Sequence, residues 1–303
     1  MFHRFCNTKK DLKIPGTITK KNFEDIIKFI NPKRILSPTK WIAKVENNRL
    51  QKKDLCITFD DGLQCQKDVA LPILNKYGLK AFWFIPTGSF FNKFDNNEIF
   101  INLIYNNFEN FKVFFKEFKS FNKFNDKIFR SKKFFKYSKI QKKYCIYYSQ
   151  EEIQYRYLRD ILFSKKNFEM FNISFFLKKK IDFSKENKKI WLSKKDITNL
   201  SENNHVIGMH SFSHPPKISK LPYSKQFMEY KKNYETLSSI CKKKIVSMSH
   251  PMNSYNSDTF KILKKMGIIC GFKADTSNNN NQKIDLNLAI KRIDAREILD
   301  KIF

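Results

Sequence analysis

The sequence Cys-Ile-Thr-Phe-Asp-Asp-Gly, residues 56–62, joins a short apolar run to two adjacent carboxylates and a glycine. An apolar run of this length that ends in a turn signal predicts a buried strand, and α/β folds place their chemistry beyond such strand ends. Because neighbouring side chains on a strand point to opposite faces, Asp60 and Asp61 can act together only where the strand ends and Gly62 lets the backbone turn. The same pattern is typical of an ordinary strand-to-turn transition, so this stretch alone leaves both interpretations open.

Strand and helix patterns alternate beyond this stretch. Apolar residues at helical spacing from Val69 to Tyr77, followed by Gly78, predict a helix, and the run Ala81–Ile85 predicts a second buried strand. Later strands are expected at residues 205–209, 245–248, 268–272 and 289–293, with helical patterns between them. Repeated β-α alternation predicts an α/β fold with a parallel sheet, and about seven such units would close a barrel.

The segment before residues 56–62 has clear signals for one helix only. Thr19 can cap a helix that Asn31-Pro32 would end. From there a polar link through Asn47 and Asn48 is expected to lead into the strand.

Residues 92–189 differ in composition from the rest of the chain. Residues 101–190 hold 16 of the 32 phenylalanines, no Gly or Pro, and 22 Lys or Arg against 9 Asp or Glu. The apolar residues from Ile104 to Phe118 recur at helical spacing and predict a helix. We therefore interpret residues 92–189 as a Phe- and Lys-rich, mostly helical insertion within a single domain that spans residues 1–303.

The formal net charge of +30 would suit a polyanionic partner. The lysines are spread along the whole chain and no nucleic-acid-binding motif accompanies them, so specific nucleic-acid binding is not expected, although loose association with anionic surfaces is. Six scattered cysteines indicate reduced thiols. The sequence contains no apolar run long enough for a signal peptide or a membrane span, so a cytoplasmic location is expected.

Two histidine-containing clusters follow predicted strands. His210-Ser-Phe-Ser-His214 places two of the five histidines where both can converge on one ion, and an Asp-His-His set would leave coordination positions for water and substrate, as a catalytic divalent metal needs. A structural histidine pair is the alternative. Residues 249–256, Ser-His-Pro-Met-Asn-Ser-Tyr-Asn, are typical of an active-site loop, or of an Asn-rich turn before a helix.

These motifs together resemble the polysaccharide deacetylases of the NodB-homology family, a carbohydrate esterase type. The resemblance rests on residues 58–62 (Thr-Phe-Asp-Asp-Gly), 71–74 (Leu-Pro-Ile-Leu), 81–85, 191–193 (Trp-Leu-Ser) and 207–215 (Ile-Gly-Met-His-Ser-Phe-Ser-His-Pro), and on Met1-Phe2-His3-Arg4 at the start. It implies a distorted (β/α) barrel and a hydrolase that uses a divalent metal, commonly zinc, with Co²⁺ or Ni²⁺ as alternatives. The implied reaction removes acetyl groups from an acetylated sugar or polysaccharide precursor.

Carried over by position, the resemblance implies a role for each motif residue. Asp60 would be the catalytic base, with a metal-bound water as nucleophile, and the metal ligands would be Asp61, His210 and His214. The family takes an oxyanion-binding backbone N–H from the residue after the proline of its third motif. Here that pair is Pro251 and Met252.

This sequence departs from the family pattern in two places. His250-Pro-Met-Asn stands where relatives often have an aromatic-Pro-aromatic-Gly loop, and the late histidine that can act as general acid has no counterpart after residue 250. His250 is then the candidate proton donor. Arg292 is a candidate to orient Asp60 by an ion pair, with Asp275 as a helper, and a surface charge is the alternative for either residue. These departures leave a second hypothesis open, a catalytically impaired deacetylase-like protein that binds glycan.

Overall fold

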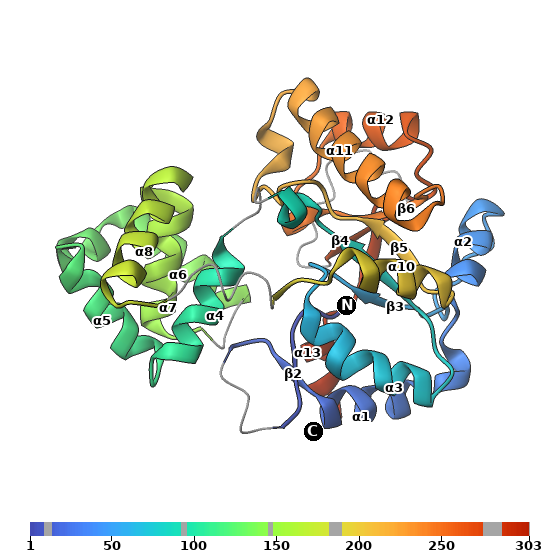
Figure 1. Ribbon diagram of the computed structural model, residues 1–303, viewed down its shortest axis with the longest axis horizontal. Helices are drawn as coiled ribbons and strands as arrows, with labels where there is room; N and C mark the ends of the chain where they lie inside the picture. Colours follow the sequence, from blue (N-terminus) through green and yellow to red (C-terminus); the bar gives the residue numbers. More distant parts are fainter. Residues whose placement is uncertain (9–13, 92–95, 145–147, 182–189, 275–286, 303) are drawn as a thin grey trace. The chain divides into compact units, whose positions relative to one another are not determined.

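A computed structural model describes residues 1–8, 14–91, 96–144, 148–181, 190–274 and 287–302 of the chain (Figure 1). Contacts divide the chain into two compact units. The barrel unit comprises Met1–Asp11, Thr17–Asp95 and Trp191–Phe303, and the helical unit comprises Leu12–Gly16 and Asn96–Ile190. The interpretation of residues 92–189 as an insertion within one domain stays a prediction, and residues 92–95 and 182–189 lie outside the described part.

Among the described residues, six parallel strands form the main sheet of the barrel unit in sequence order. They are β3 (Ile57–Phe59), β4 (Ala81–Ile85), β5 (Val206–Met209), β6 (Ser247–Ser249), β7 (Cys270–Ala274) and β8 (Ile290–Arg292). Each follows a connection long enough for a crossover, as parallel pairing requires. The predicted parallel α/β sheet is therefore confirmed.

The first two residues of the chain join the two ends of this sheet. Phe2 N donates to Thr58 O (3.0 Å), and Asp60 N donates to Phe2 O (3.0 Å). On the other side the Met1 amino group donates to Ile293 O (2.8 Å), just beyond β8. Met1 and Phe2 thus fill a seventh position, and the distorted (β/α) barrel of about seven strands is confirmed. A short pair, β1 (Phe5–Cys6) and β2 (Ile18–Thr19), lies beside it.

Helices cover the outer face of the sheet, with α1 and α3 on one side of the barrel and α11 and α12 on the other (Figure 1). The helices of the barrel unit are α1 (Lys20–Ile30), α2 (Pro38–Glu46), α3 (Leu71–Lys76), α10 (Lys194–Glu202), α11 (Tyr223–Cys241), α12 (Ser257–Lys265) and α13 (Ala295–Leu299). Helix α2 is the exception to this outer layer, because its Trp41 packs against Phe272 on the inner side of the sheet. The prediction of α1 is confirmed, because Thr19 Oγ1 accepts a hydrogen bond from Asn22 N (3.0 Å) as its N-cap.

Helix α2 corrects the expected polar link. Ser37 caps it and Pro38 starts it, both favourable signals, but the helix is only nine residues long. Its buried apolar residues include Trp41 and Val45, which pack against the barrel core. Two apolar residues four apart are too few to show a periodic pattern in the sequence.

Alternate residues of strand β4 face two different cores. On β4, Trp83 packs with the outer helices, whereas Phe82 and Phe84 pack on the inner face with Phe272 of β7. Both faces are buried, which is why this strand is a continuous apolar run. Gly208 of β5 faces inward, where a Cβ would lie 2.5 Å from the Phe84 ring, so the close approach of these strands requires glycine.

The helical unit contains α4 (Asn97–Asn107), α5 (Phe111–Phe121), α6 (Lys132–Tyr144), α7 (Gln150–Tyr157) and α8 (Lys165–Lys178). The apolar stripe from residue 104 to residue 118, predicted as one helix, is two. Helix α4 ends at Asn107, and Asn110 starts α5 by accepting a hydrogen bond from Val113 N at its side-chain oxygen (3.0 Å). Local capping by Asn110 outweighs the continuity of the apolar stripe.

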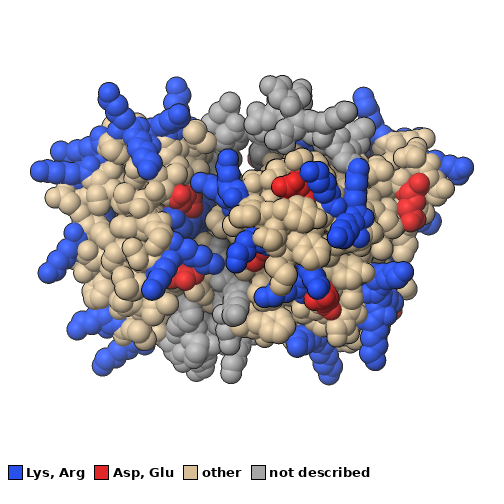
Figure 2. All heavy atoms as spheres, turned by 90° about the horizontal axis from the view of Figure 1, so that it is seen from above, with Lys and Arg blue, Asp and Glu red and all other residues tan. Residues whose placement is uncertain are grey.

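Two further properties concern the charge of the surface and the character of the helices. Lys and Arg are spread over the whole face seen in Figure 2, not gathered on one element. Of the helices that the structure describes, none combines the length and apolar character that a membrane crossing would need.

Candidate metal and catalytic centre

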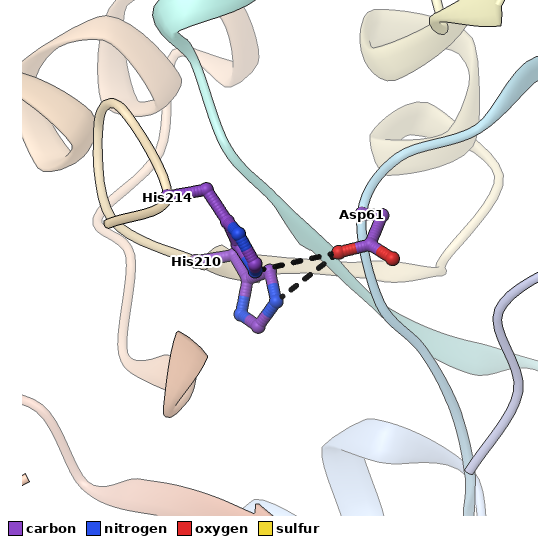
Figure 3. Close-up of side chains that lie close together, drawn as sticks. All are labelled: Asp61, His210 and His214. Carbon is purple, nitrogen blue, oxygen red and sulfur yellow. Dashed lines mark ion pairs between the residues drawn. The ribbon is translucent and has the colours of Figure 1, made fainter. Parts of the chain in front are cut away.

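Asp61, His210 and His214 lie together beyond the ends of strands β3 and β5, which flank β4 in the sheet (Figure 3). Asp61 follows β3, and the two histidines belong to the loop after β5. Asp61 Oδ1 lies 3.4 Å from His210 Nε2 and 3.6 Å from His214 Nε2. One ligand atom from each residue lies within 4.8 Å of the other two. The structure therefore brings together the three residues that the sequence singled out as metal ligands.

The tautomer of His210 makes this group suitable for a cation. His210 Nδ1 lies 2.9 Å from Ser249 O, and because a carbonyl oxygen only accepts, Nδ1 carries the proton. In the neutral ring Nε2 then presents a lone pair toward the Asp61 carboxylate. Two electron-rich atoms at this separation need a proton or a cation between them. Two imidazole nitrogens and a carboxylate oxygen, with one ring oriented by a backbone carbonyl, fit a divalent metal of the zinc type.

Asp61 and His210 each stabilise the charged form of the other. Burial opposes ionisation of Asp61, but hydrogen bonding with His210 and the nearby histidine charges hold its pKa well below the usual range. Burial likewise opposes protonation of His210, yet Asp61 and Asp60 raise its pKa above the ordinary value. A proton on His210 can thus occupy the place that a metal would take.

The backbone at this group adopts the left-handed region at several residues other than glycine. Asp61 has φ 76°, Ser211 has φ 60° and His214 has φ 52°. Such conformations cost about 1–3 kcal/mol each and persist only where surrounding contacts enforce them. Gly62, with φ 64°, continues the turn that separates Asp61 from the strand.

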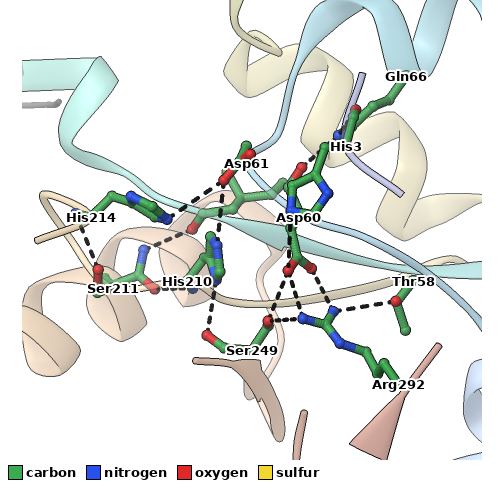
Figure 4. Close-up of polar contacts among 12 residues, drawn as sticks. His3, Thr58, Asp60, Asp61, Gln66, His210, Ser211, His214, Ser249 and Arg292 are labelled. Atoms are coloured by element: carbon green, nitrogen blue, oxygen red, sulfur yellow. Dashed lines mark hydrogen bonds and ion pairs between the residues drawn. The ribbon is translucent and has the colours of Figure 1, made fainter. Parts of the chain in front are cut away.

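Asp60 is buried on the inner face of the sheet and held by Arg292 of β8 (Figure 4). Arg292 donates from its two terminal nitrogens to Oδ1 and Oδ2 of Asp60, both at 2.7 Å. Burial alone would raise the pKa of Asp60, but the charge and hydrogen bonds of Arg292 hold this pKa far below its usual value. Arg292 is itself buried, so the alternative of a surface charge does not apply. Asp275 lies outside the described residues.

Ser249 connects the carboxylate to the histidine. Its hydroxyl donates to Asp60 Oδ2 (3.0 Å) and accepts from Arg292 (2.8 Å), while its carbonyl accepts from His210. The sequence placed Ser249 only at the start of a loop motif and assigned it no role. Its position directly after a predicted strand, like that of Asp60, was the signal that could have identified it.

The residues of the third cluster, the loop that begins at Ser249, differ from one another in burial. His250 is buried, donates from Nε2 to Leu288 O (2.7 Å) and stacks on Tyr255, and burial lowers its pKa to about 4. Pro251 is buried next to it, and Met252 has an exposed side chain and φ 49°. The roles inferred for these three residues stay predictions.

His3 lies at the same rim and was missed by the sequence reasoning. Its Nε2 is 3.9 Å from Asp60 Oδ2, and 39% of its side chain is exposed. Gln66 fixes the neighbouring backbone by donating to His3 O (2.8 Å) and to Asp60 O (2.5 Å). The available signal was Met1-Phe2-His3-Arg4, which resembled an opening strand of the family.

Comparisons with known proteins agree with this fold and indicate the family. A family model described as polysaccharide deacetylase matches residues 47–101 and 162–270, more than half of the chain. The fold is similar to that of a deacetylase, PplD, from Streptococcus pyogenes, solved with acetate (15% identity, 100% of this chain and 96% of that chain covered, TM-score 0.55). It is also similar to a de-N-acetylase from Aggregatibacter actinomycetemcomitans (12% identity, 100% and 97% covered, TM-score 0.53). No curated protein sequence matches this chain.

Proposed function

The chain belongs to the polysaccharide deacetylase family, and on this premise we propose that it is a metal-dependent hydrolase that removes acetyl groups from an acetylated sugar or polysaccharide precursor. The observation that carries the proposal is the convergence of Asp61, His210 and His214 beside a buried, ionised Asp60. No other group of three such ligand-type side chains is found among the described residues.

In this proposal Asp61, His210 and His214 hold the metal, and their nitrogen and oxygen donors favour Zn²⁺, with Co²⁺ or Ni²⁺ as substitutes. A divalent cation there would supply a Lewis acid that lowers the pKa of a water and polarises the acetyl carbonyl. Ser249 contributes by holding the His210 ring so that its Nε2 lone pair faces the site.

Asp60 acts as the base that takes a proton from the attacking water. Its Oδ1 accepts one hydrogen bond, from Arg292, so it retains capacity for a second donor. Arg292 and Ser249 orient the carboxylate and keep it ionised, so the base is in its active form throughout the working pH range.

The remaining roles concern the oxyanion and the leaving group. We assign the backbone N–H of Met252, after Pro251, to the oxyanion, as the resemblance implied. A leaving amine or alcohol needs a proton, and two histidines are candidates. His3 is the better placed, because its imidazole is partly exposed near Asp60. His250 is buried, and its Nε2 is already bonded to a carbonyl.

Acetate release tests the proposal directly. The metal-stripped protein, the same protein with added Zn²⁺ or Co²⁺, and an Asp60→Asn variant are incubated with acetylated chito-oligosaccharides and with O-acetylated xylan. Metal-loaded wild type should release acetate from one substrate class, and Asp60→Asn should lower the rate about 10²- to 10⁴-fold. If the metal-loaded wild type binds these glycans but releases no acetate, the impaired glycan-binding alternative replaces the enzyme.

The cytoplasmic location expected from the sequence stays a prediction and forms a separate part of the proposal. It would make the substrate a glycan under assembly. Cell fractionation with an antibody to the native protein checks this, and recovery of the protein outside the cytoplasmic fraction would contradict it.

A further inference from the structure

The loop that carries both histidines needs external support. Between His210 and His214 the backbone is neither helix nor strand, and Ser211 and His214 have left-handed φ values of 60° and 52°. Within the loop, His214 N donates to Ser211 Oγ at a long 3.2 Å. A segment with this much strain keeps a single geometry only if surrounding groups hold it.

Glu229 of α11 holds the middle of this loop. Its Oε2 accepts from the backbone nitrogens of Phe212 (3.1 Å) and Ser213 (2.8 Å), and its Oε1 accepts from Ser213 Oγ (2.8 Å). One carboxylate thus satisfies three donors that lie between the two histidines. Hydrogen bonds to a charged acceptor are stronger than neutral ones, so this contact can maintain a strained backbone.

Asn233 of α11 holds the start of the same loop. Its side chain is fully buried, its Oδ1 accepts from His210 N (3.0 Å), and its Nδ2 donates to Ile85 O (2.9 Å) and Thr87 Oγ1 (3.0 Å). The amide therefore links the end of β4 to the backbone of a histidine that follows β5. Glu229 and Asn233 are four residues apart, so one face of α11 presents both groups.

We propose that Glu229 and Asn233 are positioning residues for the metal site, and that α11 sets the distance between the two histidine rings. This inference rests on the proposed function. Their hydrogen bonds reach the backbone of residues 210–213, so they act through the loop and not on substrate. Groups that orient metal ligands typically change metal affinity about 10- to 100-fold when removed.

The test measures metal affinity, not turnover. Zn²⁺ and Co²⁺ dissociation constants are determined by chelator competition for wild type, Glu229→Ala, Glu229→Gln and Glu235→Ala. Glu235 is the matched control, because it lies on the same helix, is exposed, and pairs only with Lys231 among the described contacts. Glu229→Ala should weaken binding at least tenfold, Glu229→Gln by less because one acceptor oxygen is kept, and Glu235→Ala by less than twofold.

Thermal unfolding of the metal-free proteins separates positioning from loss of fold. Glu229→Ala should melt near the wild-type temperature without metal and should lose most of the rise that Zn²⁺ produces in wild type. Asn233→Asp keeps the acceptor for His210 N but replaces the donor, and it should fall between wild type and Glu229→Ala in affinity. If Glu229→Ala binds metal within twofold of the wild-type affinity, the positioning role is wrong but the proposed function stands. If the wild-type protein binds no metal, the proposed function itself is wrong.

Discussion

The barrel unit and the helical unit are both built on phenylalanine, but they arrange their polar side chains differently. In the helical unit such groups form pairs with each other: Tyr105 donates to Glu152 (2.6 Å), and Tyr155 donates to Asn172 (2.5 Å). In the barrel unit Asp60 is likewise paired with Arg292, but Asp61 converges with His210 and His214 beyond the strand ends. Pairing stabilises a helical core, whereas convergence at a sheet edge creates a site that can bind and react.

We expect the two units to differ most in how much stability one ion pair contributes, because the pair in the barrel unit is buried and the pair in the helical unit is partly exposed. Arg292→Leu leaves Asp60 buried without its partner, and removing one member of a buried pair costs about 3–5 kcal/mol of unfolding free energy. Arg159→Leu removes a more exposed partner of Asp160, which also accepts from Tyr137, and should cost about 1 kcal/mol or less. Urea unfolding of both variants measures this. Equal losses of unfolding free energy would show that the burial of Asp60 does not make its ion pair more important for stability.

We expect the next largest effect, on the rate of acetate release, from removing the proton donor to the leaving group. His3→Gln should lower kcat/KM by about 10²-fold, as expected for loss of a general acid, with KM little changed. His250→Gln should leave the rate within a few-fold of wild type, since its ring is committed to Leu288 O. Steady-state acetate release across pH checks both. The reverse order of effects would restore His250 as the donor.

Metal binding at the barrel site should depend on pH. The lone pair of His210 must be free to bind, and Asp61 and Asp60 raise the pKa of His210 despite its burial. Affinity should therefore be constant above that raised pKa and should fall about tenfold per pH unit below it. Chelator competition from pH 9 to pH 5 measures the curve. Constant affinity down to pH 5 would indicate that His210 is not a ligand.

The smallest effect concerns the helical unit alone. Asn110→Ala removes the cap of α5 and should cost about 1 kcal/mol of stability, while acetate release by the folded enzyme stays unchanged. Urea unfolding and the acetate assay are run on the same preparation. A loss of activity at full folding would mean that the helical unit takes part in the reaction.

Several features of this protein could be predicted from its sequence because they depend on short-range patterns. The apolar run before Asp60, the cap at Thr19 and the glycine after the helix in residues 71–76 each act within a few residues, and the structure confirms them. The proximity of Asp61 to His210 and His214 also followed, since the ends of parallel strands meet at one edge. Short or interrupted apolar patterns did not predict the helices correctly. Helix α2 was not expected, and the apolar stripe that Asn110 divides into α4 and α5 was predicted as one helix.

Other features were decided only by tertiary structure, because they join residues that no local pattern connects. Asp60 and Arg292 are separated by 232 positions, and only closure of the barrel through Met1 and Phe2 brings the ends of β8 and β3 close enough for them to meet. The same closure places His3 at the rim. The sequence by itself determined which strands end in reactive side chains. Packing on the inner face decided which of those side chains meet, because an ion pair or hydrogen bond depends on distance in space and not along the chain.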